Sequence, residues 1–576
     1  MFKTVFDRSC WEVRSAECYE VPRLLLLDYL EARFAKLDAQ GKTTCLIDSR
    51  DGHKVSHAEL LARSKSLAAF FQKSGLRAGD VVCLRGTNTV ETVVAFLALL
   101  FMQCTVLAVK PVQTIHDIRS LLERVPIRAA VSLGAYVADF EQLKTEMTHL
   151  ESVFNLDDAT IWTLDAERFV RPPPADPTKV VALMTATSGS TGPPKFVKHS
   201  HYSYIASCWD ILETHPCAGG LNLSLAPFSH LSGMISLVWQ LKSGMPYVLV
   251  AEEVRNSPHK LFALGQQFAV EHCMLLPVVL KMVADSDSSL KTQITTLTSV
   301  CTGGSLLDEK ALQKLFQTFP SLDRLLNVFG LSESTIIGGA VLRRGDPVDE
   351  YKWMTASYNT RLRIEDPTTR RVLPPGQIGE LVAKSPGTSL GYYDNPTANA
   401  STFIGEPGAP PSEWWVRTGD LAVMDDEGRF RVLDRIKQMI KCLDCQVVPS
   451  ELEELLYESL QRSPAGGVGD DASSATCVSH VIVAGIPHTK YIEAPTAFVV
   501  PQDEFVADVE KLREVGRRML SYIDERCAYY KHIYGGIAFV RSIPKTESGK
   551  FSKVDLRDRH LSKTLDYITV VDHPSA

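Results

Sequence analysis

The sequence predicts an α/β fold built from several units, and two observations lead to this prediction. Over residues 55–170, segments with apolar residues at helical spacing alternate with short β-rich runs. The same alternation returns over residues 201–330. Such alternation is typical of βαβ units, whose strands pair in parallel. At 576 residues, the chain is long enough for roughly two to four domains, each with a core of its own.

The first elements follow one another in this rhythm. Residues 57–75 have apolar side chains at helical spacing and end at Gly75, which predicts a helix. Residues 79–86 are predicted to form a strand, residues 91–104 a buried helix and residues 105–110 the next strand.

The later part of the chain changes character. A stiff proline-rich linker at 171–177 leads into a strand that ends in a glycine-rich loop, and the second α/β unit follows. Residues 340–430 are strand-like with frequent Pro and Gly turns, which predicts a β-rich subdomain. The basic segment DRIKQMIK at 434–441 precedes a final unit that mixes helices and strands. Inside that unit, residues 463–475 have the composition of a loop without chemistry.

Composition and charge narrow the class of protein. The net charge is −7, and no block of Lys or Arg is long enough to suggest binding to nucleic acid or to a membrane surface. The thirteen cysteines are unevenly spaced, which favours reduced thiols over a disulfide framework. The N-terminus lacks the apolar core of a signal peptide, the best apolar run is about half a membrane span, and the C-terminus is not an SKL-type signal. We therefore expect a cytoplasmic protein without a membrane span.

The segment TSGSTGPPK at 187–195 has the chemistry of a phosphate-binding loop, although it lacks the spacing of a Walker motif. Gly189 and Gly192 permit positive φ, so that successive N–H groups can converge on anionic oxygens. Lys195 adds positive charge, and hydroxyl donors come from Thr187, Ser188, Ser190 and Thr191. The alternative interpretation is a flexible Ser/Gly turn.

A second polar loop, PKTESGK at 544–550, presents Lys550. When a carboxylate attacks the α-phosphate of ATP, two anions meet and charge builds on the phosphoryl oxygens. A cation placed between them stabilises the transition state more than the ground state. An enzyme that activates a carboxylic acid with ATP needs both loops, whereas Lys550 considered alone reads as a solvated surface lysine.

Further motifs follow in a fixed order along the chain. They are PFSHLSG at 227–233, TGGSLL at 302–307, FGLSES at 329–334, RTGDLAVMDDEGRFRVLDR at 417–435 and PSELE at 449–453. Together with the two loops, they resemble the ANL superfamily of adenylate-forming enzymes. Residues 534–550 and PFSHLSGM are most similar to the branch of 4-coumarate–CoA ligases and luciferase-like enzymes.

This resemblance implies a domain organisation. A large N-terminal domain, residues 1–434, would contain two α/β subdomains and a β-rich subdomain. Residues 435–441 would form a hinge that includes Lys437, and residues 442–576 a small mobile α+β domain.

The resemblance also implies a nucleotide site for ATP and Mg²⁺. The loop from Thr187 to Lys195 would hold the β- and γ-phosphates, and Phe329 would stack on the adenine. Asp420 would accept hydrogen bonds from the ribose hydroxyls. Glu333 would help to hold Mg²⁺ as a hard oxygen ligand. The other implied contacts are Gly303, Gly304 and Ser305 at the adenine, Arg435 at the nucleotide and Thr191 at the metal.

The remaining site residues concern the acid and CoA. His230 would act in catalysis together with Lys550, at the junction of the acid and thiol tunnels. The alternative interpretation of His230 is a core histidine at the end of a strand. Val328 replaces a glycine and would narrow the acid pocket. Lys441 and Asp444 would line the CoA tunnel, where Asp444 also replaces a glycine and puts the CoA step in question. Further departures from the family pattern are Ile492 in place of glycine and Gln103-Cys104 in place of Gly-Ala.

We therefore predict an acid–CoA ligase that converts a fatty or aryl acid and ATP to acyl-AMP and pyrophosphate, and then forms acyl-CoA with CoA as co-substrate. Two alternatives stay open: an adenylating enzyme that lacks or redirects the CoA step, and a degenerate homologue that binds nucleotide or acyl ligand without turnover. The predicted partners are small molecules, and the predicted assembly is a monomer or homodimer. The GxSxG at 387–391 and the CxxC of Cys442 and Cys445 lack the context of a hydrolase or a zinc site.

Overall fold

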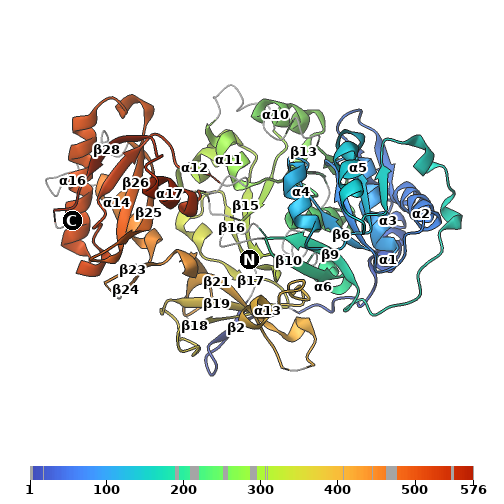
Figure 1. Cartoon of the computed structure of the whole chain (residues 1–576), viewed down its shortest axis with the longest axis horizontal. Helices are drawn as coiled ribbons and strands as arrows, with labels where there is room; N and C mark the ends of the chain where they lie inside the picture. The colour runs from blue at the N-terminus through green and yellow to red at the C-terminus, as the bar shows by residue number, and fades with distance from the viewer. Residues whose placement is uncertain are drawn as a thin grey trace. The chain divides into compact units, whose positions relative to one another are not determined.

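The computed structural model describes residues 4–16, 18–187, 194–207, 220–250, 254, 257–285, 295–304, 307, 309–406, 408–443, 445–461, 477–545 and 551–574. These residues form two compact units (Figure 1). Unit 1 contains residues 1–363, 382–418 and 425–430, and unit 2 contains residues 364–381, 419–424 and 431–576. The chain passes between the units five times. Four of these passages lie inside strands, which are β18 (Arg361–Glu365), β19 (Gly379–Lys384), β21 (Trp415–Met424) and β22 (Phe430–Arg435), and the fifth directly follows β21.

Unit 1 begins with a six-stranded sheet. Its order is β10 (Phe196–Ser200), β9 (Val181–Ala186), β6 (Thr105–Ala108), β5 (Val81–Arg85), β7 (Ala129–Ser132) and β8 (Ser152–Asn155). All pairs are parallel except β9 with β10. The helices of this region are α2 (His57–Lys73), α3 (Val90–Phe101), α4 (Ile115–Leu122) and α5 (Val137–Glu146). The predicted βαβ rhythm and parallel pairing are confirmed.

A nine-stranded sheet carries the second half of unit 1. Its order is β17 (Thr355–Ala356), β16 (Thr335–Arg343), β15 (Arg324–Leu331), β14 (Ser299–Gly303), β13 (Val270–Met274), β11 (Leu221–Ser224), β12 (Tyr247–Leu249), β3 (Thr44–Asp48) and β4 (Lys54–Ser56). The strands from β3 to β15 are parallel, and antiparallel pairs close both edges.

Helices pack between and around these strands. They are α1 (Leu26–Asp38), α6 (His201–Ser207), α8 (Leu231–Ser243), α10 (Pro258–Gln267), α11 (Pro277–Asp285), α12 (Glu309–Thr318) and α13 (Pro396–Thr402). One apolar core joins α1, α2, α3 and α8 with strands of both sheets. Helix α3 is buried on all sides except at Glu91, as its unbroken apolar sequence predicts. Its long apolar surface therefore fastens the two α/β regions to each other.

Short strands complete unit 1, as the Pro- and Gly-rich sequence after residue 340 predicts. Strand β1 (Thr4–Asp7) pairs with β2 (Glu12–Ser15), which pairs in turn with Arg361 and Leu362 of β18. Strand β20 (Phe403–Ile404) pairs with the first residues of β21. The proline-rich residues 171–177 have no regular structure, in agreement with the predicted linker.

Unit 2 is an α+β body. Its sheet contains β24 (Cys445–Val447), β23 (Ile440–Cys442), β26 (Ile492–Pro501), β27 (Ile537–Val540) and β28 (Tyr567–Val571), and β25 (Val478–His488) pairs with β26. Helices α14 (Pro449–Gln461), α16 (Val509–Arg526) and α17 (Lys553–Leu561) cover this sheet. A core of its own, centred on residues such as Leu452, Phe539 and Met519, holds the unit together.

Two further findings concern cysteines and membranes. The eleven cysteines within the described ranges are all free thiols, which agrees with the prediction of reduced cysteines. In the same ranges, no helix is both long and apolar enough to cross a membrane.

Candidate functional site

The ends of the predicted phosphate loop are fastened to each other at its base. Strand β9 ends before Thr187, whose N–H donates to the carbonyl of Lys195 at 2.8 Å. In return, the N–H of Lys195 donates to Oγ1 of Thr187 at 3.1 Å. The predicted residues Ser188, Gly189, Ser190, Thr191 and Gly192 lie outside the described residues. The structure therefore defines the foot of the loop, at the edge where β9 turns into β10.

Two predicted motifs, those of Lys195 and Glu333, meet at this foot through Tyr392. The Tyr392 hydroxyl donates to Oε1 of Glu333 at 2.6 Å, and Nζ of Lys195 lies 4.8 Å from the centre of the Tyr392 ring. Tyr392 is only 5% exposed, whereas Glu333 and Lys195 are half-buried. Burial, followed by the nearby Glu333 carboxylate, raises the pKa of Tyr392 well above its usual range. The phenol therefore stays protonated and remains a donor to the carboxylate.

The backbone holds the same three segments in register. Tyr392 forms an isolated antiparallel bridge with Val197 of β10, and the N–H of Tyr393 donates to the carbonyl of Phe196 at 2.7 Å. The N–H of Ser389 donates to the carbonyl of Glu333 at 2.9 Å. Because segments far apart in sequence are joined by main-chain bonds, the Glu333 carboxylate has a fixed position relative to the loop.

A buried histidine supports the turn that carries Glu333. His199 of β10 is completely buried, and its Nε2 lies 2.8 Å from the carbonyl of Ser332. Since a carbonyl can only accept, Nε2 carries the hydrogen. Burial lowers the pKa of His199 to about 4, so the ring is neutral near pH 7.

The predicted adenine residues lie on neighbouring strands. Gly303 at the end of β14 is paired with Val328 of β15, and a Cβ at Gly303 would meet Cγ2 of Val328 at 2.6 Å. The missing side chain is what lets Val328 lie against that backbone. The half-buried ring of Phe329 meets the ring of Phe430 edge-on, with 6.0 Å between ring centres. Gly304 is exposed with φ +91°, and Ser305 lies outside the described residues.

His230 caps a helix. It precedes α8, and its Nδ1 accepts the N–H of Ser232 at 3.2 Å. The alternative of a core histidine is wrong, because His230 is exposed. Gly233 in the first turn of α8 is packed against the preceding loop, since a Cβ there would come within 2.1 Å of the carbonyl oxygen of Pro227.

Unit 2 brings two of the predicted nucleotide residues together. Nε of Arg435 lies 2.7 Å from Oδ1 of Asp420, which is 3% exposed. The residue before Asp420 is also held, because the N–H of Gly419 donates to Oε1 of Glu380 at 3.1 Å. Asp420 is therefore a buried carboxylate with a guanidinium partner, which suits the acceptance of hydrogen bonds from a ligand.

Directly before the predicted hinge lies Asp434, to which the sequence analysis assigned no role. Oδ1 of Asp434 accepts the N–H of Arg435 at 2.7 Å, and its Oδ2 accepts the N–H of Ser450 at 3.3 Å, in the first turn of α14. Lys437 is exposed in the short 3-10 helix η7 (Ile436–Gln438). Lys441 is exposed on β23, and its N–H donates to Oε2 of Glu493 at 2.9 Å.

Two predicted residues of the chemistry cannot be placed: Asp444 and Lys550 lie outside the described residues. Around Asp444, the strands β23 and β24 form a hairpin in which Cys442 faces Cys445. Tyr392, His199 and Asp434 are the supporting residues that the sequence did not reveal. Tyr392 directly follows the GxSxG of residues 387–391, which the sequence analysis set aside.

Comparison with known proteins defines the class. The AMP-binding enzyme family matches residues 34–393, and the AMP-binding enzyme C-terminal domain matches residues 473–550. The chain is 26% identical over 529 residues to 4-coumarate–CoA ligase-like 6 of Arabidopsis thaliana, which covers 89% of this chain and 87% of that protein. It shares its fold with ATP-bound MatB from Rhodopseudomonas palustris, with a TM-score of 0.77 and 20% identity over 92% of this chain and 98% of the other. It also resembles the amide bond synthetase McbA from Marinactinospora thermotolerans, with a TM-score of 0.74 and 22% identity over 92% of this chain and 99% of the other.

The first match covers more than half of the chain, so the protein belongs to the AMP-binding enzyme family, within the ANL superfamily of adenylate-forming enzymes. It is an ATP-dependent, AMP-forming enzyme of the acid ligase class, near the 4-coumarate–CoA ligase branch.

Proposed function

We propose that this enzyme is an acid–CoA ligase that activates a fatty or aryl acid. ATP and the acid give acyl-AMP and pyrophosphate, and CoA then takes the acyl group and releases AMP. The observation that carries the proposal is the junction of Lys195, Glu333 and Tyr392 at the foot of the phosphate loop. A degenerate homologue has no need for a cation and a carboxylate held in this way beside such a loop.

The junction suits Mg²⁺ together with phosphate. The Glu333 carboxylate accepts one hydrogen bond from Tyr392, and a carboxylate has about four lone-pair sites, so acceptor capacity remains for a hard cation. Bound Mg²⁺ would neutralise charge on the phosphates. Glu333 would hold it, with Thr191 as the second residue assigned to the metal. Tyr392 keeps the carboxylate oriented, and Lys195 adds positive charge at the same edge.

The other residues take the roles that the family pattern assigns. Asp420, positioned by Arg435, would accept hydrogen bonds from the ribose, and Phe329 would offer a ring face to the adenine. Gly303, Gly304 and Ser305 would border the base, and Val328 would narrow the acid pocket. His230, whose Nδ1 is the acceptor in its helix cap, would present Nε2 toward the acid and thiol.

The second step, transfer of the acyl group to CoA, would require the C-terminal part of the chain to present different residues to the acyl-AMP. Residues 435–441, with Lys437, would act as a hinge between residues 1–434 and 442–576, and Lys441 would then lie along the path of CoA. Asp444 would bring a carboxylate to a position where the family pattern has glycine, and its charge would oppose the approach of anionic CoA. A second candidate is therefore an adenylating enzyme that gives its acyl group to another acceptor, and the fold it shares with an amide bond synthetase is compatible with this.

The test is pyrophosphate release with a panel of fatty and aryl acids, in the presence and absence of CoA. Lys550→Ala should slow release by about 10²-fold or more, the size of the effect of losing one preorganised donor. Lys545→Ala is the matched control, because it removes an exposed lysine five positions earlier in the same segment. Release that depends on Lys550 and is accompanied by a CoA thioester supports the ligase.

Two results would change the conclusion. Pyrophosphate release that depends on Lys550 but yields no thioester with CoA would favour the second candidate. Binding of ATP without release for any acid would identify a degenerate homologue and overturn the proposal.

A further inference from the structure

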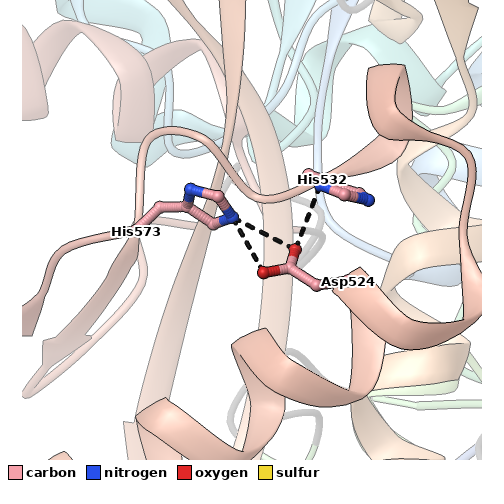
Figure 2. Close-up of side chains that lie close together, drawn as sticks. All are labelled: Asp524, His532 and His573. Atoms are coloured by element: carbon pink, nitrogen blue, oxygen red, sulfur yellow. Dashed lines mark hydrogen bonds and ion pairs between the residues drawn. The ribbon is translucent and has the colours of Figure 1, made fainter. Parts of the chain in front are cut away.

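Two histidines and one carboxylate meet in unit 2, and none of them is among the site residues predicted from the sequence (Figure 2). Asp524 lies in the last turn of α16, His532 follows the short 3-10 helix η9 (Tyr529–Lys531), and His573 follows β28. One ligand atom from each residue lies within 4.8 Å of the other two. The group therefore joins three separate segments of the chain.

The carboxylate lies between the two rings. Nε2 of His573 is 3.1 Å from Oδ1 and 3.0 Å from Oδ2 of Asp524, and Nδ1 of His532 is 3.2 Å from Oδ1 (Figure 2). Zinc ligands lie about 2.0–2.2 Å from the ion, which places neighbouring ligand atoms of a tetrahedral site roughly 3.3–3.5 Å apart. The contacts of Asp524 with the two imidazoles are within a few tenths of an ångström of this spacing, and all three ligand atoms lie within 4.8 Å of one another, so the group can supply three corners of such a site.

The contacts of His532 leave one of its ring nitrogens directed at the Asp524 carboxylate. Its Nε2 lies 3.3 Å from the carbonyl oxygen of Cys527, so the hydrogen of the neutral ring is on Nε2. In that tautomer Nδ1 has a lone pair, and this lone pair faces the Asp524 carboxylate. A nitrogen lone pair and a carboxylate oxygen that face each other at 3.2 Å can both coordinate one cation placed between them.

The contact of His532 with Cys527 resembles the hydrogen bond that commonly orients a metal-binding histidine through its second ring nitrogen. A histidine that binds a metal commonly donates its second N–H to a carbonyl or carboxylate, which fixes the ring. His573 is oriented by packing, since the ring of Tyr534 meets it edge-on at 5.1 Å and stacks on Tyr491 at 4.0 Å. Both rings are thus held in place before any ion binds.

Exposure and charge also suit an ion. The side chain of His573 is 3% exposed, whereas those of His532 and Asp524 are 18% and 31% exposed, so one side of the cluster is open to solvent. The two cations nearest in sequence have partners of their own, because Arg526 pairs with Glu525 at 3.1 Å and Lys531 with Glu451 at 2.6 Å.

We propose that Asp524, His532 and His573 bind one divalent transition-metal ion, with Zn²⁺ as the ion of choice and water completing its coordination. Two imidazoles and one carboxylate suit Zn²⁺ and its neighbours in the first transition row, whereas Mg²⁺ prefers oxygen ligands alone. The ion ties the segment after β28 to the end of α16. The site is structural, and it is independent of the proposed ligase reaction.

The test is Zn²⁺ binding to the full chain by competition with a chromophoric chelator, in excess Mg²⁺, with Co²⁺ absorption as the spectroscopic readout. We expect one ion per chain, a rise in Tm on addition of Zn²⁺, and a Co²⁺ spectrum without the near-ultraviolet band of thiolate ligands. Asp524→Asn and His532→Gln should each weaken binding at least tenfold and abolish the rise in Tm. His480→Gln, in the same unit but outside the cluster, should bind as the wild type does.

Three results would overturn the site. One is equal Zn²⁺ binding by wild type and variants, and another is a thiolate band, which would assign the ion to cysteines. The third is a metal-free protein that Zn²⁺ does not stabilise. If Asp524→Asn does not fold, His532→Gln decides, because that side chain is partly exposed and its loss leaves the helix intact.

Discussion

At the scale of single residues, Tyr392 is a positioning residue whose hydroxyl can be tested separately from its ring. Tyr392→Phe removes the 2.6 Å hydrogen bond to Glu333 but keeps the ring that Lys195 contacts. A hydrogen bond to a charged group contributes about 1.5–3 kcal/mol, which corresponds to roughly a 10- to 100-fold effect. We expect pyrophosphate release to need a higher Mg²⁺ concentration, measured as a shift of the Mg²⁺ dependence.

The adjacent tyrosine provides the matched control. Tyr393 is held in the same segment by its main-chain bond to Phe196, so Tyr393→Phe should leave the Mg²⁺ dependence where it is. An unchanged Mg²⁺ dependence in Tyr392→Phe would show that Glu333 does not act through a metal.

The sequence predicted part of this junction. Thr187, Lys195 and Glu333 were predicted from their motifs, and the structure brings Lys195 and Glu333 to the same tyrosine. The role of Tyr392 was not predictable, because its partner is 59 positions away and contacts at that distance follow from tertiary packing. His199 was equally hidden, since a buried histidine in a strand has no local pattern.

At the scale of elements, Ile492 is a strained residue that glycine would relieve. It starts β26 directly after the turn from β25, with φ 67° and a side chain that is 51% exposed. A left-handed conformation costs a residue other than glycine about 1–2 kcal/mol. Glycine removes this cost in the folded state, and its greater conformational freedom in the unfolded chain offsets only part of the gain in stability. Ile492→Gly should therefore stabilise unit 2 by about 1 kcal/mol, a rise in Tm of roughly 2 °C.

A second exposed β-branched residue serves as the comparison. Val570 in β28 is 44% exposed and lies in ordinary strand conformation, so Val570→Gly should lower Tm. A lower Tm in Ile492→Gly as well would mean that the packing of its side chain outweighs the backbone strain.

Element by element, local patterns predicted the regular structure well. The helix expected over 57–75 is α2, and the strand expected over 105–110 contains β6. Departures from the family pattern were informative too, because Gln103 and Ile492, both in place of glycine, have positive φ. The patterns did not predict the side-chain hydrogen bonds that hold each element in place. One example is the bond that the Ser450 N–H, in the first turn of α14, donates to Asp434.

At the scale of the whole molecule, two buried histidines should make the protein less stable at acidic pH. Burial lowers the pKa of His199 and of His201 to about 4, whereas an unfolded histidine titrates near 6.5. Between these values the unfolded chain binds more protons, so the free energy of unfolding falls as pH falls through this window. From pH 7 to pH 5 each histidine should contribute a loss of roughly 2 kcal/mol.

The measurement is Tm at pH 7 and at pH 5. His199→Gln keeps a donor for the carbonyl of Ser332 but does not titrate, so the difference between the two Tm values should shrink. The exposed His53 gives the control. In His53→Gln, the difference between Tm at pH 7 and Tm at pH 5 should equal that of the wild type. Equal differences in all three proteins would contradict a neutral buried His199.

The overall architecture was predictable because it depends on periodicity and on the order of motifs. The α/β class, the β-rich region and the mixed C-terminal unit are confirmed, since each reflects the spacing of apolar residues along the chain. The boundaries at 434 and 442, the oligomeric state and the cytoplasmic location stay predictions.

The division of the chain inside four strands has a consequence for inheritance. Unit 2 is assembled from three stretches, 364–381, 419–424 and 431–576, so its gene segments are interleaved with those of unit 1. A recombination event with a single crossover near residue 431 would transfer the longest stretch and leave two shorter ones behind. Recombination between homologues should therefore exchange these three stretches together or not at all. In a library of chimeras with crossovers at each junction, those that take all three stretches from one parent should fold more often than those that mix them.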